Sequence, residues 1–318
     1  MGIKHAVRVI SKFITDPNMR FCYLAKAGYY DGMDDARYLS RLFKAELGYP
    51  LNLEEPKTFN EKTQWLKLNA FKPIYTDYAD KVKVKPLVAK LIGEDHIIPT
   101  IGVWDRADDI DFAALPERFA VKCNHTSTSG VCICKDKSAL DTSALKHELD
   151  KAMKSDYFAF RREMPYKDIE KKILAEELLI EEDGSLPKDY KVFVFNGRSR
   201  FVQVDIDRFT DHRRNFYDID WNYIPFTTCY PTDPDANVIS PGLEVVRDLF
   251  GMAEKIAAGI DENLPFVRVD FYVVNGRVYF GEVTFYHGAG IERFTPQEYD
   301  WKLGDMMDIS GVKGACVI

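Results

Sequence analysis

The stretch RVDFYVVNGRVYFGEVT, residues 268–284, constrains the fold more than any other part of the chain. Two runs rich in Val, Phe and Tyr flank Asn275-Gly276, a strong short-range signal for a β-hairpin. Both runs also carry charged residues, and a charge on a buried strand is costly to desolvate unless it is paired or bound to an ion. We therefore expect these charges either to pair with each other or to face a charged ligand.

The length of the hairpin loop decides which of these charges share a face. A two-residue turn would put Asp270 and Glu282 on opposite faces of the hairpin. A three-residue loop over 274–276, with Gly276 left-handed, would place Arg268 opposite Glu282 and Asp270 diagonal to it. We adopt the three-residue loop, which gathers four polar residues on one face: Arg268, Asp270, Glu282 and Thr284.

Two carboxylates on one face suit Mg²⁺, which prefers oxygen ligands and usually completes its shell with substrate phosphates. The alternative is purely structural: a cross-strand pair between Arg268 and a carboxylate, with one exposed Asp. These residues alone do not choose between the two.

Composition restricts the class of protein. With 318 residues, 46% hydrophobic and 29% charged, the chain is typical of globular proteins, and its net charge of −7 argues against nucleic-acid binding. Six cysteines follow no disulfide-rich spacing, so we expect reduced thiols in a cytoplasmic protein. Residues 3–14 have apolar residues at helical spacing and basic residues between them, which suits either a helix docked on its own protein or a peripheral contact with the inner membrane surface.

The order of predicted elements indicates an α+β fold. Short helices are expected up to about residue 75, including one that opens with the capping box Thr58-x-x-Glu61. Beyond Phe119, antiparallel hairpins alternate with helices, and a second hairpin is expected around Asn196-Gly197. This pattern predicts two sheets, with a ligand between them.

Two weaker signals precede the opening hairpin. Lys122 lies on the apolar strand FAVKC, directly before the polar segment NHTSTSG, where backbone N–H groups and hydroxyls can meet an anion. Further on, ILAEELLIEEDG places acids where an apolar strand ends. Backbone groups there can bind the edge of an adenine, and a nearby carboxylate can bind ribose hydroxyls. Polar tips and acidic loops are also common without any ligand.

A basic cluster follows the second hairpin, in DRFTDHRRNFYD. We expect it to bind a phosphate or a substrate carboxylate, the alternative being a solvated loop. Its members are Arg208, His212, Arg213, Arg214 and Asn215.

Taken in order, these elements resemble the ATP-grasp superfamily over roughly residues 76–290. Three segments resemble sequences of its TupA-like branch, which acts in teichuronopeptide biosynthesis: KTFNEKTQWLKL, DHRRNFYDIDWN and RVDFYVVNGRVYFGEVTFYHGAG. The resemblance implies two α+β subdomains clasping a nucleotide, with a helical N-terminal region over 1–75, an N-subdomain over 76–175 and a C-subdomain over 176–318.

The resemblance also implies residue roles. Lys81 and Lys122 would contact the phosphates of ATP, and Ser127, Thr128, Ser129 and Gly130 would form the flexible loop over them. Glu177 and Leu179 would contact the adenine through their backbone, with Glu176 close by, and Asp183 would bind the ribose. Asp270, Glu282 and Thr284 would hold Mg²⁺, and Arg268 would stabilise the reacting oxyanion, with Lys122 as a second catalytic cation. Family sites commonly read Glu-x-Asn, whereas this chain has Glu282-Val283-Thr284, which puts a second metal position in question.

The function implied is an ATP- and Mg²⁺-dependent carboxylate–amine ligase. It would join an amino acid or amine to a uronic acid of a surface polysaccharide, such as a capsule, or of its precursor. A sugar or small-molecule kinase on the same fold is the first alternative, and a non-catalytic glycan-assembly partner is the second.

Overall fold

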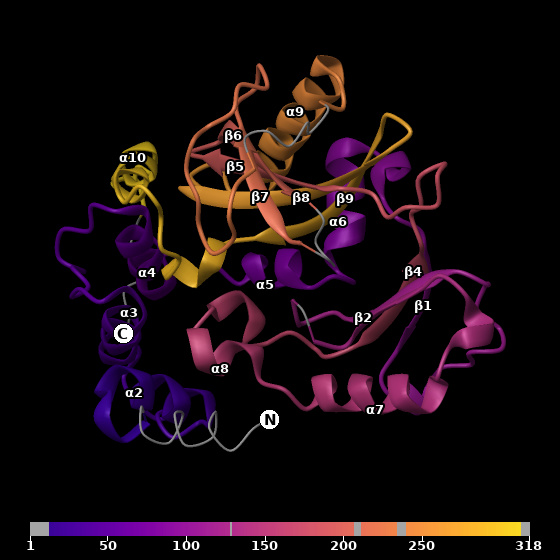
Figure 1. The fold of residues 1–318 in the computed structure, drawn as a ribbon, viewed down its shortest axis with the longest axis horizontal. Coiled ribbons are helices and arrows are strands. Elements are labelled where there is room, and N and C mark those ends of the chain that lie inside the picture. Colours follow the sequence, from indigo (N-terminus) through magenta and orange to yellow (C-terminus); the bar gives the residue numbers. More distant parts are fainter. Residues whose placement is uncertain (1–12, 128, 207–210, 234–239, 313–318) are drawn as a thin grey trace.

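Two antiparallel sheets organise the chain, which confirms the predicted α+β class. The computed structural model describes residues 13–127, 129–206, 211–233 and 240–312. In Figure 1 the larger sheet lies below helix α9 (Leu243–Ile260), and the smaller sheet lies above helix α7 (Thr142–Met153). Residues 3–12 of the predicted terminal helix, and Thr128 and Arg208 of the predicted site, fall outside the described residues.

The smaller sheet has the strand order β1-β4-β2-β3. Its strands are β1 (Thr100–Trp104), β2 (Phe119–Cys123), β3 (Val131–Cys134) and β4 (Ile173–Glu177). Phe119 and Val121 on one face pack against Leu149 of α7. The expected subdomain boundary between 175 and 176 falls inside β4, which pairs with β1 and β2 along its length.

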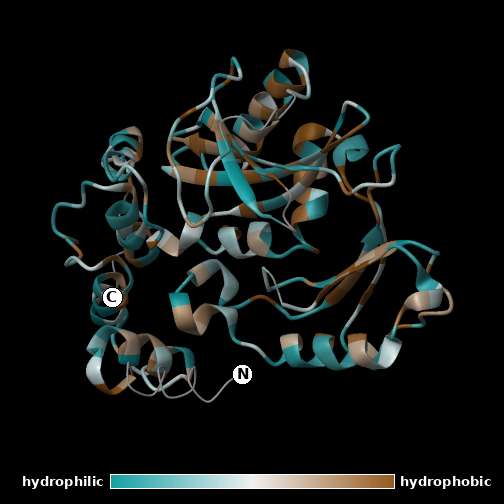
Figure 2. Ribbon diagram, viewed as in Figure 1, coloured by the Kyte–Doolittle hydropathy of each residue, from teal (hydrophilic) through white to brown (hydrophobic). Residues whose placement is uncertain are grey.

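The larger sheet has the order β7-β6-β5-β8-β9. Its strands are β5 (Asp189–Phe195), β6 (Arg198–Ile206), β7 (Arg213–Tyr217), β8 (Phe266–Val274) and β9 (Arg277–Thr284). The hairpin between β5 and β6 turns at Asn196-Gly197, as predicted, and both residues are left-handed, with φ of 47° and 75°. Figure 2 shows hydrophobic stretches along the strands, with more hydrophilic loops around them.

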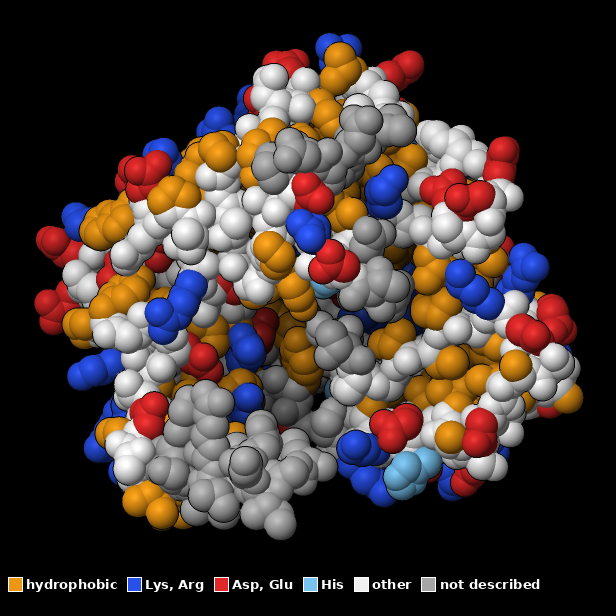
Figure 3. Space-filling model, viewed as in Figure 1, with side chains coloured by type: hydrophobic (Ala, Val, Ile, Leu, Met, Phe, Trp, Pro, Cys, Tyr) orange, Lys and Arg blue, Asp and Glu red, His pale blue; other side chains and the backbone are white. Residues whose placement is uncertain are grey.

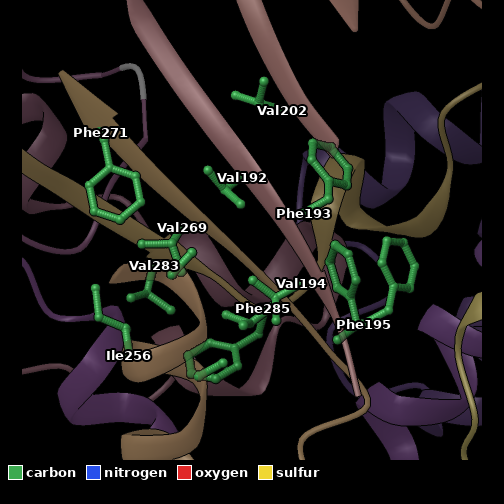
Figure 4. Close-up of a cluster of buried hydrophobic side chains, with 14 of the residues drawn as sticks. Val192, Phe193, Val194, Phe195, Val202, Ile256, Val269, Phe271, Val283 and Phe285 are labelled. Carbon is green, nitrogen blue, oxygen red and sulfur yellow. The ribbon is translucent and has the colours of Figure 1, made fainter. Parts of the chain in front are cut away.

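The two faces of the larger sheet differ in character. Val192, Val269 and Val283 point to an apolar face, where they pack with Ile256 of α9 (Figure 4). Because side chains alternate along a strand, the neighbours of these valines point to the opposite face, and several of them are charged.

The helices before the sheets match the expected short segments. They are α2 (Pro17–Lys26), α3 (Asp35–Leu47), α4 (Phe59–Asn69), α5 (Ile74–Ala79) and α6 (Val84–Ile92). The later helices are α8 (Tyr157–Arg161) and α10 (Glu298–Met306), and the 3₁₀ helices are η1 (Glu94–His96), η2 (Ala107–Asp109), η3 (Lys137–Ala139), η4 (Met164–Tyr166) and η5 (His287–Gly290). The predicted capping box is confirmed: the Thr58 hydroxyl accepts from the Glu61 N–H, and the Glu61 carboxylate accepts from the Thr58 N–H. Within the described ranges, no helix is both long and apolar enough to cross a membrane.

The β8–β9 hairpin corrects the predicted loop. Val274 pairs with Arg277, so the turn contains two residues, and both Asn275 and Gly276 are left-handed, with φ of 51° and 75°. The expected three-residue loop is therefore wrong. An Asn-Gly pair adopts this turn readily because its twist matches that of the flanking strands.

A β-bulge nevertheless brings the two acids to one face. Phe271 pairs with Phe280, but Asp270 pairs with Glu282, so Gly281 is the extra residue in β9. Asp270 and Glu282 therefore lie directly opposite each other, which confirms the prediction that they share a face. The expected pairing of Arg268 with Glu282 is wrong, because Arg268 pairs with Thr284.

The close packing at the bulge gives a test. A Cβ at Gly281 would lie 3.0 Å from the Asp270 carbonyl oxygen, whereas a Cβ at Gly251 in α9 would meet no heavy atom within 4 Å. We expect Gly281→Ala to lower the free energy of unfolding by about 1–3 kcal/mol. Gly251→Ala, the control, should raise it by up to about 1 kcal/mol, because Ala is the better helix former. Urea denaturation measures both, and an unchanged or raised stability of Gly281→Ala would contradict the crowding at the bulge.

Candidate functional site

The polar face of the larger sheet carries a row of buried charges. The residues that alternate with the valines of the apolar face come from β5, β6, β7, β8 and β9: Asp189, Lys191, Gln203, Asp205, Arg214, Arg268, Asp270 and Glu282. Most of them are buried, so each charge needs a partner. On the face drawn in Figure 3, acidic and basic side chains are intermingled as well.

Arg268 and Asp270 form the centre of this row. The Arg268 guanidinium donates to both carboxylate oxygens of Asp270, at 2.7 Å each. Lys191 Nζ adds a third contact to Asp270, at 2.8 Å. Burial opposes the charge on Arg268, but Asp270 and then Glu282 outweigh it and raise the pKa of Arg268. Both carboxylate oxygens of Asp270 therefore have cationic partners.

Glu282 is held less tightly. Its carboxylate lies 3.2 Å from Lys81 Nζ and 3.6 Å from Arg268 Nη2, and its side chain is 30% exposed. Burial alone would raise the pKa of Glu282, but Lys81 and Arg268 lower it to about 2. Glu282 is thus the carboxylate of this pair that a ligand can reach.

Lys81 links the two sheets. It follows α5 and donates to the carbonyl oxygen of Thr126, at 2.9 Å, in the connection between β2 and β3. The same ammonium faces Glu282 of the larger sheet. Lys81 is therefore positioned between the β2–β3 connection and the charged row.

The smaller sheet has its own ion cluster. Lys122 and Glu176 share the face opposite α7, and the Lys122 ammonium contacts the Glu176 carboxylate directly. Lys85 of α6 contacts the other oxygen of Glu176 at 2.5 Å. Burial opposes ionisation of Glu176, but Lys122 and then Lys85 hold its pKa below the usual value.

The β2–β3 connection is more buried than a polar tip would suggest. Asn124, His125 and Thr126 are almost wholly inaccessible, and Asn124 donates to Asp80 at 2.9 Å. Gly130 has a φ of 64°, and a Cβ there would lie 2.8 Å from Cys123 Sγ. The remaining tip residues of the predicted site, Ser127 and Ser129, lie between these buried anchors.

The predicted adenine and ribose residues follow β4. Glu177 ends the strand and is exposed, and Leu179 is half-buried just beyond it. Asp183 is exposed and accepts from the Ser185 N–H at 2.8 Å. Their roles remain predictions.

The predicted basic cluster separates into different environments. Arg213, Arg214 and Asn215 begin β7 rather than lying on a loop. Arg213 is half-exposed beside Asp211, whereas Arg214 is buried and donates to Asp205 at 2.7 Å.

His212 and Asn215, the other described members of that cluster, are also partnered. His212 Nε2 lies 3.3 Å from the Asp205 carboxylate. The buried Asn215 side chain donates to the Asp233 carbonyl oxygen at 2.7 Å. Arg214 and His212 contact the row of charges through Asp205.

The charged row closes into a ring through residues beyond β9. His287 Nδ1 lies 2.9 Å from Arg268 Nη1, and His287 Nε2 lies 3.1 Å from the Glu292 carboxylate. Glu292 in turn lies 3.9 Å from Arg214, which pairs with Asp205. We refer below to this set as the charged ring: Arg268, Asp270, Lys191, Asp205, Arg214, Glu292 and His287.

Sequence reasoning missed several members of the ring. Lys191 and Asp205 alternate with apolar residues on strands that were predicted, so their face was deducible, but their partners lie on other strands. His287 and Glu292 follow β9 without any spacing that signals chemistry. Lys85, the second partner of Glu176, was missed for the same reason.

The donor set near Glu282 suits Mg²⁺ in chemical type. Asp270 and Glu282 supply hard carboxylate oxygens on one face, and Mg²⁺ commonly uses one or two carboxylates together with substrate phosphates. Glu282 is the better donor, since both oxygens of Asp270 already accept from cations. Within the described part of the chain, no cluster of three or more His, Cys, Asp or Glu side chains is arranged around a metal position.

Two cavities among the described residues are lined by side chains outside the charged ring. One, of about 400 Å³, is lined by residues near the end of α4 and of α9, including Lys72 and Asp261. The other, of about 390 Å³, borders Lys85 and Thr100, and Thr100 pairs with Glu176 in the smaller sheet. The second cavity therefore adjoins the Lys122–Glu176 cluster.

A family model and several solved structures are similar to this chain. A family model described as TupA-like ATPgrasp matches residues 61–308. Solved structures with a similar fold include an ATP complex of D-alanine–D-alanine ligase from Bacillus anthracis (15% identity, TM-score 0.40, 71% of this chain and 55% of that chain) and L-amino acid ligase from Bacillus licheniformis (11%, 0.44, 82% and 57%). This chain spans less than two thirds of either ligase, and similarity at this level supports no statement about activity. No curated protein matches the sequence.

The buried carboxylates predict an acid-sensitive fold. Burial opposes the charge of Asp205, but Arg214 and then Lys191 lower its pKa below the value near 3.9 of an unfolded Asp. This stabilisation is complete above the unfolded pKa and is lost as the pH falls through the folded pKa. We expect the free energy of unfolding to be level from about pH 7 to 5 and to fall from about pH 4 downward.

Asp205→Asn tests this assignment. At neutral pH it should cost about 3–5 kcal/mol, because it leaves Arg214 and Lys191 buried without that partner. It should also flatten the loss of stability below about pH 4. Asp108→Asn, at an exposed position, is the control, and urea denaturation across the pH range is the measurement. An unchanged acid slope in Asp205→Asn would refute the role of Asp205.

Proposed function

Because the chain belongs to the TupA-like ATP-grasp family and has its ATP-grasp fold, we propose that it is an ATP- and Mg²⁺-dependent carboxylate–amine ligase. The observation that supports this most is the juxtaposition of two ion clusters. Lys122 and Glu176 lie on the smaller sheet, Arg268, Asp270 and Glu282 lie on the larger one, and Lys81 contacts both sides. Such an arrangement suits a polyanion held between the sheets.

The nucleotide would lie along the smaller sheet and its tip. Lys81 and Lys122 would contact phosphate oxygens, with the N–H groups of Ser129 and Gly130 nearby. Glu177 and Leu179 would contact the adenine through their backbone, and Asp183 would accept from the ribose hydroxyls. Lys122 would exchange part of its contact with Glu176 for the phosphate, while Lys85 keeps Glu176 neutralised.

The metal would be held at the other side of the phosphates. Glu282 and Asp270 would be its protein ligands, with Thr284 beside them. When bound, Mg²⁺ would neutralise phosphate charge. The acidic partners already in place keep Arg268 oriented across the same face.

The reaction would proceed in two steps. A substrate carboxylate attacks the γ-phosphorus of ATP, which forms an acyl phosphate and releases ADP. The amine then attacks the acyl carbon, and inorganic phosphate leaves as the amide forms, while the ammonium protons are released to solvent. Arg268 would stabilise the oxyanion of the tetrahedral intermediate, since its guanidinium is held rigidly by Asp270.

The substrate class rests on the family resemblance. We propose a uronic acid of a surface polysaccharide or its precursor as the carboxylate, and an amino acid or amine as the nucleophile, at the cytoplasmic face of the inner membrane. Arg213 and Arg214 are the candidate contacts to the sugar acid. Arg213 is the better candidate, because its side chain is half-exposed whereas that of Arg214 is buried.

Trapping with hydroxylamine separates a ligase from a kinase. The protein is incubated with Mg·ATP, hydroxylamine and a panel of uronic acids, including glucuronic and galacturonic acid. A ligase yields a hydroxamate together with ADP, because hydroxylamine intercepts the acyl phosphate. ADP formation with a stable phosphorylated sugar would instead establish the kinase, and failure to bind Mg·ATP would establish the non-catalytic alternative.

Lys122→Gln should lower kcat by about 10²–10³-fold, the usual effect of removing one charge-stabilising contact to a reacting group. The fold should be retained, because Lys85 still neutralises Glu176. Lys151→Gln on the exposed surface of α7 is the matched control. Wild-type ADP release by Lys122→Gln would remove Lys122 from the site.

Glu282→Gln should weaken turnover most at limiting Mg²⁺, because an amide is a poorer ligand than a carboxylate. Raising the Mg²⁺ concentration should restore part of the activity. The measurement is the Mg²⁺ dependence of ADP release, and an unchanged dependence would show that Glu282 does not hold the metal.

A further inference from the structure

Glu292 is the acid of the charged ring that lacks a close cation. Among the described residues, the nearest cationic group is Arg214, 3.9 Å away, and that guanidinium already donates to Asp205 at 2.7 Å. Asp270, by contrast, has three cationic contacts within 2.8 Å. The Glu292 side chain is only 17% exposed, so water compensates its charge poorly.

The neighbouring histidine does not supply the missing positive charge. A guanidinium can only donate, so the 2.9 Å contact with Arg268 Nη1 requires His287 Nδ1 to accept. The imidazole of His287 is therefore neutral, with its proton on Nε2. Burial lowers the pKa of His287 despite the nearby Glu292. His287 Nε2 and Glu292 Oε2 lie 3.1 Å apart without a well-aligned hydrogen bond, and Glu292 Oε1 accepts from the Cys229 thiol at 3.4 Å. Burial opposes the charge of Glu292, but His287 and then Arg214 lower its pKa to about 2, so the carboxylate is ionised while its close donors are neutral.

The backbone around Glu292 is fixed before any ligand arrives. Gly288, Ala289 and Gly290 all have positive φ, of 55°, 52° and 63°, which is an unusual conformation for Ala289. Side chains of α4 hold this turn from one side. Gln64 donates to the carbonyl oxygens of Ala289 and Gly290, at 2.8 and 2.7 Å.

Two more donors of α4 extend this support. Lys67 donates to the Ala289 carbonyl oxygen at 2.9 Å, and Asn60 donates to that of Glu292 at 2.8 Å. A carboxylate on so well-anchored a segment cannot easily swing out to water. Its lack of a cation is therefore built into the fold.

We propose that Glu292 binds the ammonium group of the amine substrate. This rests on the ligase function proposed above and assigns the second substrate as a cationic amine, such as an amino acid or a polyamine, rather than a neutral one. The position is suitable, because His287 connects Glu292 directly to Arg268. An amine held there would lie close to the guanidinium that would stabilise the tetrahedral intermediate.

A small cation gives a test that needs no turnover. Methylammonium chloride, compared with sodium chloride at matched ionic strength, should raise the Tm of the wild-type protein and not that of Glu292→Gln. An equal response of both proteins would overturn the proposal. This outcome does not depend on whether the protein is a ligase.

Kinetics then connect the site to the reaction. Hydroxylamine is uncharged at neutral pH, so Glu292→Gln should retain hydroxamate formation. With a cationic amine its KM for the amine should rise about tenfold to a hundredfold, with the KM for ATP unchanged. Equal losses with hydroxylamine and with the cationic amine would contradict ammonium binding. Absence of hydroxamate in the wild-type protein would refute the ligase itself, while the methylammonium result would still decide the binding site.

Discussion

Neutralisation of buried charge is the constraint on which the site depends. The polar face of the larger sheet buries acids and bases that water cannot screen, so each charge is stable only beside its partner. Lys191 is shared between carboxylates of β5 and β8, and Arg214 is shared between Asp205 of β6 and Glu292 of the segment after β9. The same contacts that make these strands compatible with a folded core also fix Arg268 and Glu282 in space.

The N-terminal helices take part in this arrangement rather than merely flanking it. One side of α4 presents Asn60, Gln64 and Lys67, which recur at helical spacing and donate to carbonyl oxygens of the turn after β9. The capping box at Thr58 fixes where this helix begins and thus where those donors lie. The family match starts at residue 61, within α4, which is consistent with a functional unit that includes this helix.

Local sequence patterns predicted the secondary structure of this molecule better than they predicted its long-range contacts. Alternating apolar residues identified both hairpins of the larger sheet, and the requirement that buried charges share a face correctly placed Asp270 with Glu282. The loop chosen to achieve this was wrong, because nothing in the local pattern of β9 distinguished a bulge at Gly281 from a longer turn. The partners Lys191, Asp205 and Glu292 were not predicted, because proximity between segments that are far apart in the sequence has no local signature.

Because of the bulge, β9 should tolerate the deletion of one residue at Gly281 better than the insertion of one. Loss of Gly281 would remove the extra residue and leave Glu282 opposite Asp270, with Val283 still facing the core. A residue added beside Gly281, unless the bulge absorbed it, would exchange the two faces of the strand end. Glu282 would then enter the apolar layer under α9, and Val283 would take its place among the charges. Homologous chains should therefore differ here by deletion far more often than by single-residue insertion.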